Sequence, residues 1–398
     1  MLRLTRLRLT RYRSYAAAEL RFAAPMVVFS GPNGAGKTNL LEAISLLGPG
    51  RGLRGARISE VAIGGAPPWA VSGHFEDGLD GFEVGTGSLP GIPPGIPPGN
   101  PPGNPLGNLE EGSPERRIFR LDGEKVGTQA ELAERVATVW LTPQMDRLFQ
   151  ESAGGRRRFL DRLAMALEPH LAREVTAYEA AMAGRNRLLN PNRGGGRAEA
   201  AWLAGLEDAM ARHGIAMAAS RRALVARLNA ALEGGAAGDF PAASLALQCP
   251  AAALLDVMPA LAAEDALREG WAAARVRDAA ASATLSGPHR ADLQFTHAAK
   301  AMPAGLCSTG EQKALLISTV LAHAGLIAAA RGFAPILLLD EVAAHLDEAR
   351  RAALFAALAA LPAQSFLTGT DREVFSPLAG TAEGWRITPG EAHASPLS

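Results

Sequence analysis

Eight residues near the start of the chain have the types and spacing of a phosphate-binding loop. They are Gly31, Pro32, Asn33, Gly34, Ala35, Gly36, Lys37 and Thr38. Glycines in such a loop let backbone amides face phosphate oxygens at a helix N-terminus, the lysine reaches the β- and γ-phosphates, and the hydroxyl binds Mg²⁺. The apolar run 26–30 predicts a strand before the loop, and the run from Asn39 predicts a helix after it. The sequence therefore predicts a site for ATP and Mg²⁺, and we include Asn39 in it.

Two adjacent carboxylates follow an apolar run near the other end of the chain. Residues 335–339 read Pro-Ile-Leu-Leu-Leu, and Asp340 and Glu341 come directly after them. Such a run is typical of a strand buried on both faces of a parallel sheet, whose C-terminal end borders the ligand site. We expect Asp340 to hold Mg²⁺ and Glu341 to activate water as a general base. An apolar run followed by two carboxylates is weak evidence for a nucleotide site by itself. It becomes stronger evidence because the same chain also has a phosphate-binding loop.

A third motif, Ser-Thr-Gly-Glu-Gln-Lys at 308–313, precedes a long apolar helical segment. A serine hydroxyl and a glycine amide at a helix start can bind an anion, and in ABC-type ATPases such a signature meets the γ-phosphate held by the partner subunit. Ser308 and Glu311 also have the spacing of a capping box, so a structural role is open. We assign Ser308, Gly310 and Gln312 to the nucleotide site.

Two single residues extend the predicted site. Asp347, in Ala-His-Leu-Asp behind the carboxylate pair, resembles the D-loop that lines a paired interface, although it could simply cap the next helix. Gln144, in Leu-Thr-Pro-Gln, resembles a Q-loop glutamine that senses Mg²⁺ and water, although glutamine in a loop is commonplace. We assign Asp347 to the nucleotide site and Gln144 to catalysis and Mg²⁺.

An α/β layer must position these motifs, and the chain supplies it in two separated parts. Strand signals at 1–9 and 26–30 open the first part, and the segment from Leu285 supplies the second. Between them, 156–189 and about 198–232 have a helical pattern and predict a short antiparallel hairpin. We predict an α/β protein with an ABC-type ATPase head and an inserted helical arm. Its parts are an N-terminal lobe 1–145, an arm domain 146–275 with a loop-rich stretch near 234–260, and a C-terminal lobe 276–398.

Residues 90–108 are a Pro/Gly repeat without the three-residue glycine period of collagen, and we expect a disordered surface loop there. The 398 residues are 48% hydrophobic, which indicates a globular chain. Two cysteines are too few for a disulfide framework and fit a reducing cytosol. The start lacks a signal-peptide core, and the apolar run 315–330 is shorter than the roughly 20 residues that span a bilayer. We expect a cytoplasmic protein with no membrane partner and a buried helix at 315–330.

Overall charge, 40 basic against 40 acidic residues, gives no case for a nucleic-acid partner. Charge is local instead, because residues 1–60 hold ten basic side chains and three acidic ones. A basic face there could bind DNA phosphates without reading bases, or it could be an ordinary solvated strand face. The candidate DNA-binding residues are Arg6, Arg8, Arg54, Arg57, Arg156 and Arg157.

The order of these motifs resembles that of the RecF family in the ABC/SMC ATPase superfamily, over the whole chain. Further segments carry the resemblance, at 9–15, 50–54, 156–161, 185–189 and 286–292. Tyr12 and Ser14 depart from it, because the family usually has Phe and Asn there. The resemblance implies an ATP-dependent homodimer that binds single-stranded, linear or gapped double-stranded DNA in replication, recombinational repair and the SOS response. It further implies work with RecO and RecR, promotion of recombinase loading, and a place for Arg13 in the nucleotide site.

Other classes of ATPase share some of these motifs. A transporter ATPase has its signature about 100 residues after the phosphate-binding loop, whereas here the gap is about 270 residues. A chromosome-structural SMC protein or a nuclease-partner ATPase needs far longer arms than the roughly 75 residues present. A non-hydrolytic ATP-gated DNA clamp stays open beside a weak DNA-dependent ATPase. Glu341 argues for hydrolysis, while the strand at 365–370 lacks the switch histidine of transporters.

Overall fold

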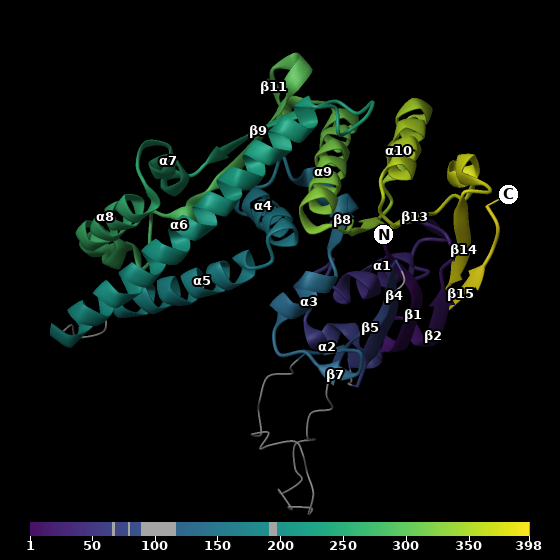
Figure 1. The fold of residues 1–398 in the computed structure, drawn as a ribbon, viewed down its shortest axis with the longest axis horizontal. Coiled ribbons are helices and arrows are strands. Elements are labelled where there is room, and N and C mark those ends of the chain that lie inside the picture. The colour runs from purple at the N-terminus through teal and green to yellow at the C-terminus, as the bar shows by residue number, and fades with distance from the viewer. Residues whose placement is uncertain (66–67, 79, 89–116, 191–196, 398) are drawn as a thin grey trace, which may run out of the picture. The chain divides into compact units, whose positions relative to one another are not determined.

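The computed structural model describes residues 1–65, 68–78, 80–88, 117–190 and 197–397 (Figure 1). The Pro/Gly repeat expected to be a disordered loop lies outside the described residues. The chain forms two compact units. Unit 1 comprises Met1–Trp140, Phe333–His345 and Pro362–Ser398, and unit 2 comprises Leu141–Gly332 and Leu346–Leu361. This division places the signature segment with the helical arm, so the three-part division at 145 and 275 remains a proposal.

Unit 1 contains an antiparallel sheet with the strand order β2-β1-β4-β5-β6-β7. Its strands are β1 (Leu2–Tyr12), β2 (Tyr15–Arg21), β4 (Ala70–Asp77), β5 (Asp80–Ser88), β6 (Arg117–Leu121) and β7 (Glu124–Lys125). In β1, Leu2, Leu4, Leu7 and Leu9 are buried while arginines lie between them. The register with β4 shifts between Leu4 and Arg6. This irregularity explains why the leucine alternation skips one residue, because an extra residue in a strand reverses the facing of those that follow.

The second sheet of unit 1 has the order β15-β14-β3-β13-β12-β8. Its strands are β3 (Met26–Ser30), β8 (Thr138–Leu141), β12 (Ile336–Leu339), β13 (Ser365–Gly369), β14 (Ala382–Thr388) and β15 (Glu391–Ala394). Strand β13 pairs in parallel with both β3 and β12, which aligns the C-terminal ends of all three. Helices α1 (Lys37–Leu46), α2 (Ile58–Val61) and α3 (Gln129–Arg135) complete the unit. Strands from both ends of the sequence thus form one α/β layer, as predicted. The second part begins at β12 rather than at Leu285, because residues 285–332 belong to unit 2.

Unit 2 is mostly helical (Figure 1). Its helices are α4 (Ala153–Leu167), α5 (Leu171–Leu188), α6 (Arg197–Glu233), α7 (Pro250–Val257), α8 (Ala260–Ala281), α9 (Thr309–Arg331) and α10 (Glu348–Ala360). Helices α5 and α6 pack along each other and form the predicted hairpin. The helical pattern at 156–189 is two helices rather than one, and α8 also packs on α6.

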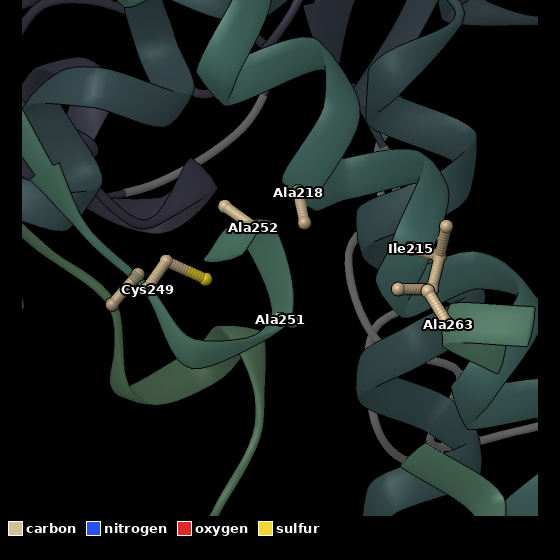
Figure 2. Close-up of a cluster of buried hydrophobic side chains, with 7 residues drawn as sticks. Ile215, Ala218, Cys249, Ala251, Ala252 and Ala263 are labelled. Atoms are coloured by element: carbon tan, nitrogen blue, oxygen red, sulfur yellow. The ribbon is translucent and has the colours of Figure 1, made fainter. Parts of the chain in front are cut away.

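The prediction of a loop-rich stretch near 234–260 was wrong in part, because these residues include β9 (Ala243–Gln248) and α7. Strand β9 pairs with β10 (Asp292–His297), which also pairs with β11 (Met302–Pro303). Helix α7 begins with Pro250 at a first-turn position, where the fixed φ of proline favours a helix start. Figure 2 shows a buried hydrophobic cluster to which α7 contributes. In it, small side chains such as Ala218 and Ala252 lie near Cys249. Small residues let neighbouring backbones approach closely, and this packing gives an alanine-rich stretch its structure.

Helix α9 is long and apolar enough to cross a membrane by length and composition alone. Most of it is buried, however, including 72% of its most apolar stretch. It packs against α4 and α6 within unit 2. Its burial agrees with the prediction of a buried helix at 315–330.

Candidate functional site

The phosphate-binding loop connects β3 to α1, in the strand-loop-helix context that the sequence predicted. Gly36, directly before α1, has a φ of 111°, in the left-handed region that favours glycine. A Cβ at Gly36 would also lie 2.9 Å from both Ser14 Oγ and Tyr15 Oη. The side chain of Lys37 is buried, and its Nζ donates to the carbonyl oxygens of Gly31 at 2.8 Å and Pro32 at 3.2 Å. The ammonium group therefore lies over the loop that is predicted to cradle phosphates.

Thr38 and Asp340 meet although 302 positions separate them in the sequence. The Thr38 Oγ1 hydroxyl lies 2.9 Å from Asp340 Oδ1 and 3.1 Å from Oδ2. Asp340 is 5% exposed, and burial raises the pKa of its carboxyl group although hydrogen bonds from two threonines oppose the shift. A hydroxyl beside one or two carboxylates is a donor set that suits Mg²⁺, which takes its remaining ligands from phosphates and water. The described residues contain no cluster of three or more His, Cys, Asp or Glu side chains that would suit another metal better.

Glu341 follows Asp340 with a left-handed backbone, at a φ of 53°. Its N–H donates to Thr368 Oγ1 at 2.9 Å. Its carboxylate is partly exposed, and Oε1 lies 3.4 Å from Lys37 Nζ. Two candidate catalytic side chains of unit 1 therefore form an ion pair with each other.

Thr368 is a residue of this site that the sequence analysis did not assign. It lies in β13, between β3 and β12, and is fully buried. Its hydroxyl donates to Asp340 Oδ1 at 2.8 Å and accepts the Glu341 N–H. A threonine in a buried strand is commonplace because β-branched residues favour strands, so no sequence signal separates this one from a structural threonine.

A buried carboxylate beside the loop, Glu42 of α1, was also missed. Glu42 is 1% exposed and accepts two hydrogen bonds from Arg13, at 2.8 and 2.6 Å. Arg54 donates to Glu42 at 3.1 Å and to Asn39 Oδ1 at 2.8 Å. The Glu42 carboxylate raises the pKa of Arg13. Arg13 and Asn39 are thus held at the phosphate-binding helix, and Glu42 fixes the position of Arg13.

Five of the six candidate DNA-binding arginines donate to acceptors within their own unit. The pairs are Arg6–Glu83 at 3.1 Å, Arg8–Glu19 at 2.7 Å, Arg54–Glu42 at 3.1 Å and Arg156–Asp292 at 2.7 Å, while Arg157 donates to the Ala291 carbonyl at 3.0 Å. Arg57 is exposed. An arginine paired with a carboxylate offers less net charge to a phosphate, so the basic face is weaker than the sequence count indicates. Whether these residues bind DNA stays a prediction.

In unit 2, Ser308 is the N-cap of α9 and forms the capping box with Glu311. The Ser308 hydroxyl and N–H each lie 2.9 Å from Glu311 Oε2. Lys300 pairs with the same carboxylate, and these contacts lower the pKa of Glu311 to about 2. A Cβ at Gly310 would lie 2.8 Å from Nη1 of Arg350, so a cation lies beside the helix start. The structural role of the Ser308–Glu311 spacing is therefore present, and a role in anion binding stays a prediction.

Gln312, which the sequence assigned to the nucleotide, is buried beside the loop that precedes α9. It is 3% exposed, and its Nε2 donates to the Cys307 carbonyl at 3.0 Å. This bond holds the loop before α9, and a contact between Gln312 and the nucleotide stays a prediction. Asp347 caps α10 by accepting the Arg350 N–H at 2.8 Å, which is the structural alternative for this residue.

Gln144 is exposed in a 3-10 turn, Pro143–Arg147. Asp146 in the same turn lies 3.8 Å from Nζ of Lys313, in the first turns of α9. The turn is therefore anchored to the signature helix within unit 2. Each unit gathers its own part of the predicted site. Unit 1 holds the loop, Arg13, Asp340 and Glu341, and unit 2 holds Gln144, Ser308, Gly310, Gln312 and Asp347.

Comparison with known proteins identifies the family. A family model described as an AAA domain matches residues 6–55. The DNA replication and repair protein RecF of Mesorhizobium japonicum is 46% identical over 390 residues, which cover 97% of this chain and 96% of the relative. RecF of Agrobacterium fabrum is 47% identical over 396 residues, covering 97% of each chain. This chain belongs to the RecF family.

Solved structures agree on the fold. The structure of "the recombination mediator protein RecF-ATP in RecFOR pathway" matches with a TM-score of 0.80 at 20% identity, covering 99% of this chain and 98% of that one. The Smc head domain of Pyrococcus furiosus matches with a TM-score of 0.50 at 15% identity. The predicted RecF resemblance and the ABC/SMC fold class are thus confirmed. Membership of the RecF family also removes the transporter and chromosome-structural alternatives.

Proposed function

We propose that this RecF-family chain binds ATP and Mg²⁺ at the phosphate-binding loop and acts as an ATP-switched DNA-binding protein in replication and repair. The observation that carries the proposal is the contact between Thr38 and Asp340, with Lys37 and Glu341 paired beside it. These are the four side chains that a P-loop ATPase needs near the γ-phosphate. The RecF relatives and the likeness to a RecF-ATP structure support the same function.

The Lys37–Glu341 ion pair gives the site a way to couple binding to hydrolysis. Lys37 bonds loop carbonyls and Glu341, and it has to turn to the β- and γ-phosphates when ATP binds. Glu341 then loses a cation partner and can accept a proton from the attacking water. Thr38 and Asp340 would hold Mg²⁺, which would neutralise charge on the phosphates. Without a switch histidine we expect slow hydrolysis, and a non-hydrolytic ATP-gated clamp is the alternative.

We further propose that ATP joins two copies of the chain. Ser308 and Gly310 lie in unit 2 while the phosphate-binding loop lies in unit 1, and ABC-type ATPases use these motifs from opposite subunits. The finer functions follow the family resemblance. They are binding at single-stranded gaps and junctions, action with RecO and RecR, recombinase loading, a part in the SOS response, and a cytoplasmic location.

The test of this function is a measurement of mass in solution with and without ATP, Mg²⁺ and gapped DNA. We expect monomer without nucleotide and dimer with ATP and Mg²⁺, and we expect gapped duplex to bind the dimer more tightly. Dimer without nucleotide, or monomer at saturating ATP, would contradict the divided site.

DNA binding has a separate test that takes account of the arginine pairs. Replacing Arg6 and Arg8 with glutamine removes two charges and their ion pairs with partly exposed carboxylates, whereas replacing Arg54 disturbs buried Glu42. Each DNA phosphate that the variant no longer neutralises should reduce the slope of log affinity against log salt by about 0.9 on duplex DNA. Titrations of gapped duplex at several salt concentrations, with ATP present, measure that slope. Unchanged slopes for Arg6/Arg8 and for Arg156/Arg157 double variants would exclude these residues from the DNA surface.

A further inference from the structure

Thr368 is hydrogen-bonded to both Asp340 and Glu341, the adjacent carboxylate residues after β12. Strand β13 has hydrogen-bonded neighbours on both sides, β3 and β12, so its backbone is fixed by the sheet. Thr368 is fully buried, and a β-branched side chain in a strand has few rotamers available. The direction of its hydroxyl is therefore set by the fold rather than by solvent.

The hydroxyl makes two hydrogen bonds of defined direction. It has one proton, which it donates to Asp340 Oδ1 at 2.8 Å, and its oxygen accepts the Glu341 N–H at 2.9 Å. Asp340 Oδ1 also accepts from Thr38 at 2.9 Å. Oδ1 thus receives two hydroxyl donors. Oδ2, which Thr38 approaches at the longer distance of 3.1 Å, is therefore the oxygen better placed to face a metal ion.

The second bond bears on the shape of the chain at Glu341. A glutamate with a φ of 53° is in the left-handed region, which is unfavourable for a residue other than glycine. Its N–H would also lose this hydrogen bond if the Thr368 hydroxyl were absent, and leaving a partly buried amide unpaired is unfavourable. The bond from Glu341 to Thr368 therefore stabilises the conformation that brings the Glu341 carboxylate to 3.4 Å from Lys37.

We propose that Thr368 is a positioning residue for ATP hydrolysis, whose hydroxyl fixes the Mg²⁺-binding carboxylate and the backbone of the general base in one arrangement. The inference rests on the proposed ATPase function. Thr368 acts through Asp340 and Glu341 rather than on the nucleotide itself. Because it bonds both residues, its loss should change Mg²⁺ dependence and turnover together.

The experiment compares Thr368→Val, which keeps the shape and removes the hydroxyl, with Thr368→Ser, which keeps the hydroxyl. Binding of a fluorescent ATP analogue in EDTA should be unchanged in both, because Lys37 and the loop are intact. The Mg²⁺ concentration for half-maximal binding should rise about tenfold in Thr368→Val, and kcat should fall about tenfold or more with little change in KM, as the loss of hydrogen bonds to charged and catalytic groups implies. Thr368→Ser should restore both to within about threefold of wild type.

Thr319→Val is the matched control for the loss of a buried threonine hydroxyl. Thr319 is fully buried in α9 and donates to the Leu315 carbonyl at 2.7 Å, away from Asp340 in the chain and in a different unit. It should lower the melting temperature without changing Mg²⁺ dependence. Should Thr368→Val not fold, Thr368→Ala supplies the same measurement with less bulk.

Two outcomes would overturn the inference. Wild-type Mg²⁺ dependence and kcat in Thr368→Val would show that the hydroxyl positions nothing, and failure of Thr368→Ser to restore a defect would show that the defect is one of packing. Failure of the proposed function looks different, because the wild-type chain itself would then show no Mg²⁺-dependent ATP binding.

Discussion

The two regions that carry the nucleotide motifs satisfy their polar side chains in different ways. In unit 1, Thr38 bonds Asp340 and Lys37 pairs with Glu341, across about 300 positions of sequence. In unit 2, Ser308 bonds Glu311 and Asp347 bonds Arg350, each only three positions away. The first region is a composite site that exists only when distant strands adjoin. The second is a pair of local helix starts, whose geometry is set before any ligand arrives.

This difference indicates what a substitution does in each region. A change in unit 1 should remove binding or chemistry, because each side chain there holds another in place. A change at a helix start in unit 2 should leave ATP binding intact and affect the proposed ATP-dependent dimerisation. Four predictions test this contrast.

The largest effect is expected from Lys37→Met in unit 1. Methionine has a similar length but lacks the charge that holds the phosphates, so ATP affinity should fall about 100-fold or more and the ATP-dependent dimer should be lost. Titration with a fluorescent ATP analogue and measurement of mass check both. Lys125→Met, on the exposed strand β7, is the control and should behave as wild type. Retained affinity in Lys37→Met would mean that the loop does not bind ATP.

Glu341→Gln should separate binding from chemistry within unit 1. The amide cannot act as a general base, so the hydrolysis rate should fall about 100- to 10,000-fold. ATP binding should persist, and the variant should accumulate as a dimer on DNA. Phosphate release under single-turnover conditions measures the rate. Equal rates in wild type and variant would remove Glu341 from the mechanism and favour the non-hydrolytic clamp.

Ser308→Arg tests the region in unit 2. Arginine adds bulk and charge at the start of α9 and removes its N-cap, at a cost of about 1 kcal/mol in the free energy of unfolding. The helix should still fold without its N-cap, so ATP affinity should stay within about threefold of wild type. The ATP-dependent dimer, in contrast, should be lost. Sedimentation with ATP measures the dimer, and Ser308→Thr, which keeps the hydroxyl, should retain it. An ATP-dependent dimer of Ser308→Arg would show that the signature motif at 308–313 does not lie at the dimer interface.

The smallest effect is a pH dependence of stability from unit 2. His323 is fully buried with Nε2 2.8 Å from the Leu163 carbonyl, and burial lowers the pKa of His323 to about 3. The unfolded chain protonates this residue below about 6.5 and the folded chain does not, so stability is full above that pH and falls as pH drops toward 3. The loss between pH 7 and pH 5 should be roughly 1–2 kcal/mol. Urea unfolding at both pH values checks it, and His323→Gln should show a smaller difference.

The sequence alone determined the local features of both regions. The β3-loop-α1 unit, the strand before Asp340 and the capping box at Ser308 are each encoded by adjacent residues, whose spacing and types specify a turn, a buried strand or a helix start. The RecF resemblance was available for the same reason, because the order of these motifs along the chain survives without any knowledge of contacts.

Only the tertiary structure decided which side chains meet. Thr368 joined the site because the sheet places β13 between β3 and β12, and Glu42 became the partner of Arg13 and Arg54 because α1 lies beside the turn after β1. It also gave Gln312 a structural role, through burial that a helix-start motif does not reveal. Long-range hydrogen bonds depend on strand order and register. Those follow from the packing of the whole unit rather than from the residues next to each partner.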